Sequence, residues 1–219
     1  MPTWDDLFTW PEFIQIESRP DTRVVTLVDI FRARNYKRVY DLGCGIGRHV
    51  ILFASYGFDV FGSDISQNGL EYAKRWLQQE GLTASLFFAD MTTIPCPSNY
   101  FDAIVCRSVI THNTVSNIQK CIHEMYRTLR SGGMVYVTFI SPECSDYGNG
   151  EQVEPNTFLL ANGPEAGILH HFTTRGEITS WMSMFKTVDL LHDVTPSPPQ
   201  GNLPAYTSAQ WIFLGEAIK

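Results

Sequence analysis

Apolar residues in the stretch 38–140 follow two alternating patterns. Short apolar runs, typical of buried strands, are each followed by a segment whose apolar residues recur every three or four positions, as on one face of a helix. The runs predict five strands, at 38–42, 58–64, 84–90, 101–106 and 134–140. This alternation favours an α/β fold, with a parallel sheet, right-handed crossovers and helices on both faces.

The predicted helices have recognisable ends. One follows the first strand and ends at Gly57, and a second runs from a Ser66 cap to about Glu80. A third is expected to begin at Ser116, with Gln119 completing a capping box, and to end at 131–133. An earlier helix is expected around four apolar residues at helical spacing: Val24, Leu27, Val28 and Phe31.

The alternation stops after residue 140. Residues 141–172 show no clean period, and a loop of that length in a compact domain is typical of a lid or binding insert. Thr174 with Glu177 predicts another helix, and two strands at 187–194 and 208–217 are too close in sequence for a crossover, so they should pair antiparallel. We expect one domain over 1–219, with a helical cap at 1–34 and a substrate-side insert at 141–175.

Composition narrows the range of partners. The formal net charge is −7 and the 16 Lys and Arg residues are scattered, which disfavours nucleic acid and anionic membrane as partners and favours a small molecule. The first twenty residues have neither a basic start nor a long apolar run, so a cytoplasmic location is expected. Five cysteines without a C-x-x-C pair, and no cluster of His, Asp and Glu at ligand spacing, predict no metal.

Three glycines follow the first strand at every second position: Gly43, Gly45 and Gly47. In α/β sheets ligands bind beyond the carboxyl ends of the strands, so this bare backbone is expected to lie against a ligand. Asp64 ends the second strand, where an acid can bind ribose hydroxyls. Arg48 and Val50 occupy the places where a dinucleotide fingerprint needs a small residue, which favours a nucleoside without phosphates.

Five segments in the stretch 35–140 together resemble the class I S-adenosylmethionine-dependent methyltransferases of the small methyltransferase 11/25 type. They read VYDLGCGIGRH, VFGSDIS, FFADMTTIP, FDAIVCRSVITHN and IHEMYRTLRSGGMVYVTF, in the order of that family's motifs. The resemblance implies a Rossmann-like, mostly parallel seven-stranded sheet with strand order 3-2-1-4-5-7-6. It also implies that S-adenosylmethionine is the cofactor and S-adenosylhomocysteine the product.

The resemblance assigns cofactor contacts to particular residues. Asp41 and the three glycines would surround the methionine part, Asp64 with Ile65 the ribose side, and Asp90 with Met91 the adenine. Arg107 would line the crevice mainly through its backbone, and Arg48 would contact the cofactor carboxylate or remain in solvent. The Asn/Asp-Pro-Pro-aromatic motif of the family's nucleic-acid enzymes is replaced here by CRSV, which disfavours nucleic-acid methylation.

Histidines provide the candidate chemistry on the acceptor side. A neutral histidine near the methyl group can remove a proton from a hydroxyl or amine acceptor, although sulfonium methyl transfer does not require a base. His112 is the leading candidate, followed by His170 and His171, with packing roles as the alternative for each. We therefore expect a methyltransferase acting on O, N or S of a small molecule, as a monomer or homodimer. The alternatives are an inert cofactor-binding sensor or accessory subunit and, less favoured, an oxidoreductase.

Overall fold

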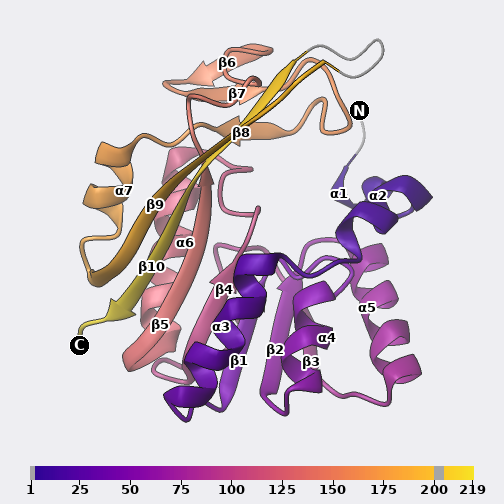
Figure 1. Cartoon of the computed structure of the whole chain (residues 1–219), viewed down its shortest axis with the longest axis vertical. Coiled ribbons are helices and arrows are strands. Elements are labelled where there is room, and N and C mark those ends of the chain that lie inside the picture. The colour runs from indigo at the N-terminus through magenta and orange to yellow at the C-terminus, as the bar shows by residue number, and fades with distance from the viewer. Residues whose placement is uncertain (1–2, 200–204) are drawn as a thin grey trace.

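Seven strands form one twisted sheet in the computed structural model, which describes residues 3–199 and 205–219 (Figure 1). In spatial order the strands are β3 (Ser85–Phe88), β2 (Asp59–Asp64), β1 (Arg38–Leu42), β4 (Phe101–Cys106), β5 (Leu129–Ile140), β10 (Tyr206–Ala217) and β9 (Phe185–Ser197). The first five are parallel, and β10 is antiparallel to both β5 and β9. The predicted order 3-2-1-4-5-7-6 is therefore confirmed, with β9 and β10 as the sixth and seventh strands.

Helices cover both faces of this sheet. One face carries α3 (Thr22–Ala33), α4 (Arg48–Ser55) and α5 (Gln67–Glu80), and the other carries α6 (Val115–Thr128) and α7 (Arg175–Trp181). Two buried apolar clusters, one on each side of the sheet, hold these layers together. The ends of α5 are as predicted, because the Ser66 side chain accepts from the Gly69 N–H and Gly81 adopts a left-handed conformation.

The ends of α6 differ from the prediction. The helix begins after Thr114, whose side chain makes no capping bond, so the expected Ser116 box is wrong. A carboxylate from the insert takes its place, because Glu154 Oε1 accepts from the Val115 N–H at 2.6 Å. At the other end Leu129 already pairs with Phe101 of β4, so the Ser-Gly-Gly segment lies inside β5 rather than stopping the helix.

The insert folds into a small antiparallel sheet that the sequence pattern did not indicate. Its strands are β6 (Glu151–Glu154), β7 (Thr157–Leu159) and β8 (Leu169–His171). Strands of three or four residues are too short to show a period of two. Backbone bonds join this sheet to the main body: the His171 N–H donates to Thr111 O and the Thr173 N–H to Ile140 O, both at 2.7 Å.

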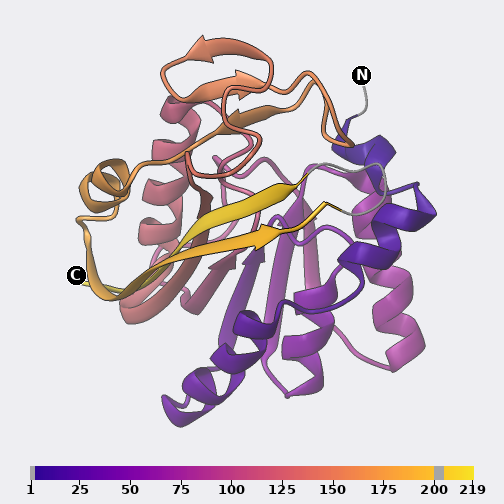
Figure 2. The same cartoon turned by 45° about the horizontal axis from the view of Figure 1, so that its top comes forward.

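The small sheet and the N-terminal helices α1 (Trp4–Leu7) and α2 (Pro11–Glu17) lie at the end of the molecule where β1, β2 and β4 terminate (Figure 2). The hairpin of β9 and β10 extends to the same end and includes part of the Pro-rich segment predicted as a connector. Residues 200–204 of that segment lie outside the described residues. Within the described ranges no helix combines the length and the apolar character needed to span a bilayer.

Candidate cofactor and acceptor site

A cleft opens at the carboxyl ends of the parallel strands. Its volume is about 220 Å³. Of the predicted cofactor residues, the following line its wall: Gly43, Gly45, Arg48, Asp64, Ile65, Asp90, Met91 and Arg107. Asp41 and Gly47 lie behind the wall rather than in it. The cleft is therefore at the predicted place, and eight of the ten predicted cofactor residues line it.

Several backbone N–H groups of the glycine turn are already hydrogen-bonded within the chain, so few are available to a ligand. The N–H groups of Gly43 and Cys44 both donate to Ser63 O, and that of Gly45 donates to Asp64 Oδ2 at 2.8 Å. Phosphate-binding turns need free N–H groups pointing at the anion, so this turn does not suit a phosphate. Gly43 has φ +72°, and a Cβ there would meet Val109 Cγ2 at 2.2 Å. Only glycine therefore fits at this point of the wall.

Gly47 has a packing role that the sequence assignment did not include, and it is not among the residues that line the cleft. It has φ +89° and immediately precedes α4. A Cβ at this position would lie 2.8 Å from the Ala73 side chain of α5. Its lack of a side chain therefore allows α4 and α5 to approach each other.

Asp64 joins the end of β2 to the glycine turn. Its two carboxylate oxygens accept N–H bonds from Gly45 and Ser66, each at 2.8 Å, and the side chain is buried in the cleft wall. Burial raises the pKa of Asp64 to about 6, against the opposing effect of these hydrogen bonds, and the negative charge of Asp41 adds to the increase. Each oxygen retains a lone pair with which it can accept a ligand hydroxyl.

Asp41 pairs loosely with a histidine that sequence reasoning did not single out. His49 lines the cleft, and its Nε2 accepts from the Asp21 N–H at 3.2 Å, so Nδ1 carries the proton. That nitrogen lies 3.8 Å from Asp41 Oδ1, while Asp41 Oδ2 is buried without a partner among the described residues. The sequence feature that could have identified His49 as a site residue is its position in the first helical turn after the glycines.

Both arginines in the wall pair with acids of the N-terminal segment. Arg48 lies 2.9 Å from Glu17, and its side chain is only 12% exposed, so it is not in free solvent. Arg107 Nε donates to Asp21 Oδ2 at 3.0 Å, so its side chain is bonded within the protein, and the predicted backbone contact with the cofactor stays a prediction. Burial raises the pKa of Asp21, but Arg107 and two backbone hydrogen bonds together lower it by more. The pKa of Asp21 therefore lies below its ordinary value. These pairs attach residues 17–21 to the cleft.

The adenine side presents one apolar and one acidic surface. Met91 contributes the apolar surface and is 7% exposed, whereas Ile65, on the ribose side, is 47% exposed. Asp90 is exposed, and its Oδ1 accepts from the Thr92 N–H and hydroxyl at 2.8 and 2.6 Å. Asp90 thus forms a turn and also lines the cleft, where the predicted contact with adenine would be made.

The three candidate histidines do not gather at one place. His112 lines the cleft and lies edge-on to His170, with ring centroids 4.5 Å apart. His171 is fully buried elsewhere, with Nδ1 2.8 Å from Thr157 Oγ1 and Nε2 3.5 Å from Glu177, so it does not reach the cleft. Burial, and after it the neighbouring His170, lowers the pKa of His112 to about 4, so the ring is neutral at neutral pH.

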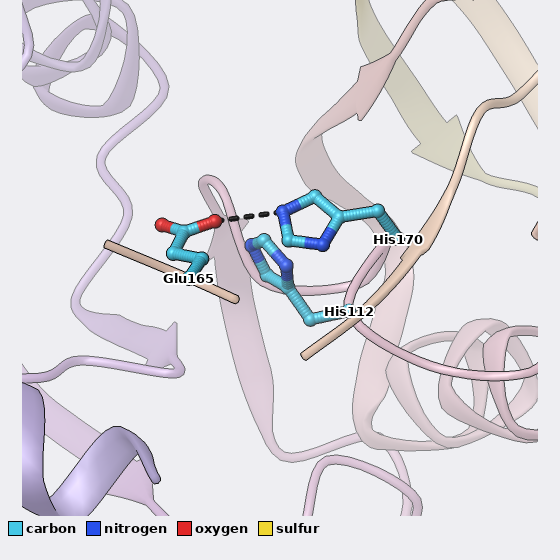
Figure 3. Close-up of side chains that lie close together, drawn as sticks. All are labelled: His112, Glu165 and His170. Carbon is cyan, nitrogen blue, oxygen red and sulfur yellow. Dashed lines mark hydrogen bonds and ion pairs between the residues drawn. The ribbon is translucent and has the colours of Figure 1, made fainter. Parts of the chain in front are cut away.

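Glu165 completes the acceptor side and was missed by sequence reasoning. It comes from the loop between β7 and β8, lines the cleft, and lies 2.7 Å from His170 Nε2 (Figure 3). Burial raises the pKa of Glu165, but the bond from His170 and the nearby His112 lower it to a greater extent. His112, Glu165 and His170 place one ligand atom each within 4.8 Å of the others, which corrects the expectation of no cluster at metal-ligand spacing.

Comparison with known proteins agrees with this geometry. A protein-family profile described as a methyltransferase domain matches residues 39–133. A SAM-dependent methyltransferase from Methanosarcina mazei superposes with a TM-score of 0.71, at 19% identity over 85% of this chain and 97% of that chain. Residues 39–133 therefore match a methyltransferase domain, and the superposition shows that the chain shares the fold of a SAM-dependent methyltransferase.

Two further relatives of this methyltransferase domain carry specific names. Phosphoethanolamine N-methyltransferase 3 of Arabidopsis thaliana is 33% identical over 114 residues, which are 51% of this chain and 22% of that protein. The Burkholderia thailandensis 1,6-didemethyltoxoflavin-N1-methyltransferase, solved with bound S-adenosylhomocysteine, has a TM-score of 0.64 at 14% identity over 90% of this chain and 78% of that chain. The chain spans about half the length, or less, of the first curated relatives that it matches.

Proposed function

We propose that the chain binds S-adenosylmethionine in the cleft and transfers its methyl group to O, N or S of a small-molecule acceptor. The observation that carries this proposal is the position of Asp64, which closes the glycine turn through the Gly45 N–H and faces the cleft. A buried acid beside a turn whose N–H groups are already used fits ribose hydroxyls and an ammonium group better than a pyrophosphate. When bound, the cofactor supplies an activated methyl group.

The wall of the cleft divides the ligand contacts between its two sides. Asp64 and Ile65 would hold the ribose side, Asp90 and Met91 the adenine, and the carbonyl groups of the glycine turn the methionine part. Trp4, His112 and Glu165 line the remaining wall and would contact the acceptor. We further propose that 1–219 is one methyltransferase domain, in which residues 1–34 and 141–175 close over the acceptor and exclude water.

Positioning would supply most of the rate. Methyl transfer from a sulfonium is a direct displacement, so alignment of the acceptor atom with the methyl group and exclusion of water lower its barrier. His112 with a pKa of about 4 is neutral and can accept a hydrogen bond, but it is a weaker base than an ordinary histidine. His112 lines the cleft and His170 packs against it, so both remain the predicted catalytic residues, whereas His171 is left out because it faces Thr157 and Glu177.

Calorimetry with the pure chain tests cofactor binding directly. We expect saturable heat with S-adenosylhomocysteine and none with NAD. The reverse result, heat with NAD alone, would overturn the proposal and favour an oxidoreductase. Saturable S-adenosylhomocysteine binding is common to the enzyme and to an inert sensor or accessory subunit, so a second measurement is needed to separate them.

Transfer from methyl-labelled cofactor to a panel of phenols, amines and thiols makes that separation. We expect label in at least one small acceptor, whereas label in none would favour the inert binder. A tRNA arm belongs in the panel because one relative, at 24% identity over 165 residues, is named tRNA N(3)-methylcytidine methyltransferase. With a net charge of −7 we expect no label in tRNA. Sedimentation of the same sample would decide between the predicted monomer and homodimer.

A further inference from the structure

Three side chains from separate parts of the chain lie close together (Figure 3), and two of them, His112 and Glu165, line the cleft. His112 follows β4, Glu165 lies in the loop between β7 and β8, and His170 is in β8. One nitrogen or oxygen atom of each lies within 4.8 Å of the other two. In Figure 3 both rings and the carboxylate turn toward a common space.

The His170 ring has an oxygen atom close to each of its two nitrogens. Both ring nitrogens face groups that only accept: Nδ1 lies 3.2 Å from Ile168 O, and Nε2 lies 2.7 Å from Glu165 Oε2. A neutral ring carries one N–H, so it can donate to only one of these two oxygens. In the tautomer whose N–H points at Ile168 O, the lone pair of Nε2 is available to bind a metal ion together with Glu165.

Two further features favour a metal ion. A carbonyl that accepts from the other ring nitrogen is the usual support of a metal-bound histidine, because it fixes the tautomer and the ring orientation. His112 adds a second imidazole at the same place, and its Nδ1 is buried without a partner among the residues that the structure describes. Two imidazoles and one carboxylate are a known ligand set of catalytic zinc sites, which leave one coordination position open.

We propose that His112, Glu165 and His170 form a three-ligand site for a divalent transition-metal ion such as Zn²⁺. Ligand atoms of a tetrahedral site with bonds of about 2.0–2.1 Å lie roughly 3.4 Å apart, within the spread of the present cluster after small side-chain shifts. Because His112 and Glu165 line the cleft, the open position faces the space proposed for the acceptor.

The site would have two effects. It would tie the segment after β4 to the insert, and so fix the acceptor wall. In addition, and here the inference rests on the proposed function, the open position would bind an oxygen or sulfur atom of the acceptor. A metal-bound hydroxyl or thiol loses its proton more easily than a free one. The acceptor class would then be an oxygen or sulfur donor rather than an alkylamine.

Metal binding tests the site independently of catalysis. The experiment uses the full chain without a histidine tag, after a chelator has removed any bound metal. Titration with Co²⁺, a spectroscopic substitute for Zn²⁺, should give a visible absorption band that saturates at one ion per chain, and Zn²⁺ should displace it. His112→Ala and Glu165→Gln should each weaken Co²⁺ binding at least about tenfold. The amide of Glu165→Gln can still hydrogen-bond to His170 Nε2, so the protein should remain folded.

His123→Ala is the matched control, because His123 is an exposed histidine on α6 whose Nδ1 is 2.7 Å from Gln119 O. This variant should bind Co²⁺ like the unchanged chain. Absence of saturable Co²⁺ uptake by the unchanged chain would overturn the inference, as would equal affinity in Glu165→Gln. Circular dichroism and S-adenosylhomocysteine binding by each variant identify any loss of fold. Co²⁺ uptake without S-adenosylhomocysteine binding would reject the proposed function and leave the metal site standing.

Discussion

The two sides of the cleft differ in how their polar groups are satisfied. On the cofactor side Asp64 accepts two backbone bonds, and the N–H groups of the glycine turn donate within the chain. On the acceptor side, two consecutive residues have a buried polar side-chain atom without a partner among the described residues: Thr111 Oγ1 and His112 Nδ1. The hydrogen bonds of Asp64 and the glycine turn hold one geometry on the cofactor side, where Asp41 Oδ2 is the exception, whereas unpaired buried groups cost free energy until a ligand pairs with them. The hydrogen-bonded geometry of the cofactor side therefore exists before a ligand binds. On the acceptor side, the unpaired buried groups would gain partners only when a ligand binds.

Substitution of Gly43 tests the rigidity of the cofactor side and should have the largest effect. Gly43→Ala places a Cβ 2.2 Å from Val109 and forces a left-handed conformation on a residue with a side chain. The combined clash and strain should lower the free energy of unfolding by at least about 2 kcal/mol, measured by urea denaturation. Gly57→Ala is the control, because Gly57 has φ +82° but no atom within 4 Å of the added Cβ.

We expect Gly57→Ala to lower the free energy of unfolding by only about 1 kcal/mol. An equal loss in the two variants would show that the turn is not tightly packed.

Asp64→Ala should have the next largest effect, on cofactor affinity. Loss of a charged hydrogen-bond acceptor should weaken S-adenosylhomocysteine binding by roughly 1–3 kcal/mol, measured by calorimetry. Asp59→Ala is the matched control at the opposite end of β2, where the side chain is 59% exposed. Unchanged affinity in Asp64→Ala would remove Asp64 from the site.

The pH dependence of the same affinity should be moderate and should come from Asp64. A ribose hydroxyl donates to the ionised carboxylate, so binding requires the form that exists above a pKa of about 6. Affinity should therefore be constant above that pH and fall as pH decreases through it, approaching tenfold per pH unit, with a proton released on binding at low pH. In Asp64→Ala this decrease should be absent. A fall of the same size in that variant would assign the titration to another group.

The same difference explains how much could be predicted from the sequence. The cofactor side is made of residues at the ends of consecutive strands, and a glycine or an acid at such a position reflects a local demand of backbone geometry. The sheet could be predicted for the same reason, because each strand and helix carries its own period. Gly47 shows the limit, because its requirement for a small residue comes from Ala73 of another helix.

The acceptor side could not be predicted in this way. His112 and Glu165 are far apart in the chain and meet only because three very short strands fold the insert back over β4. The same holds for the cap of α6, where Glu154 replaces the expected Ser116, and for His171, which the fold directs away from its neighbour His170. Contacts of this kind depend on tertiary structure, and no local period or spacing specifies them.

Arg48 and Glu17 offer the smallest and most discriminating test of how far the cofactor side is preformed. Their side chains are 2.9 Å apart and 12% and 27% exposed, so the charge of Arg48 is already neutralised before a ligand arrives. Arg48→Ala and Glu17→Gln should therefore each change the free energy of unfolding by about 1 kcal/mol or less, with similar small losses of S-adenosylhomocysteine affinity. If Arg48 instead binds the cofactor carboxylate, Arg48→Ala alone should weaken affinity by roughly a further tenfold, since a charged hydrogen bond would be lost. Equal losses in the two variants would show that Arg48 serves to hold the N-terminal helices in place, and that the carboxylate is held by other groups.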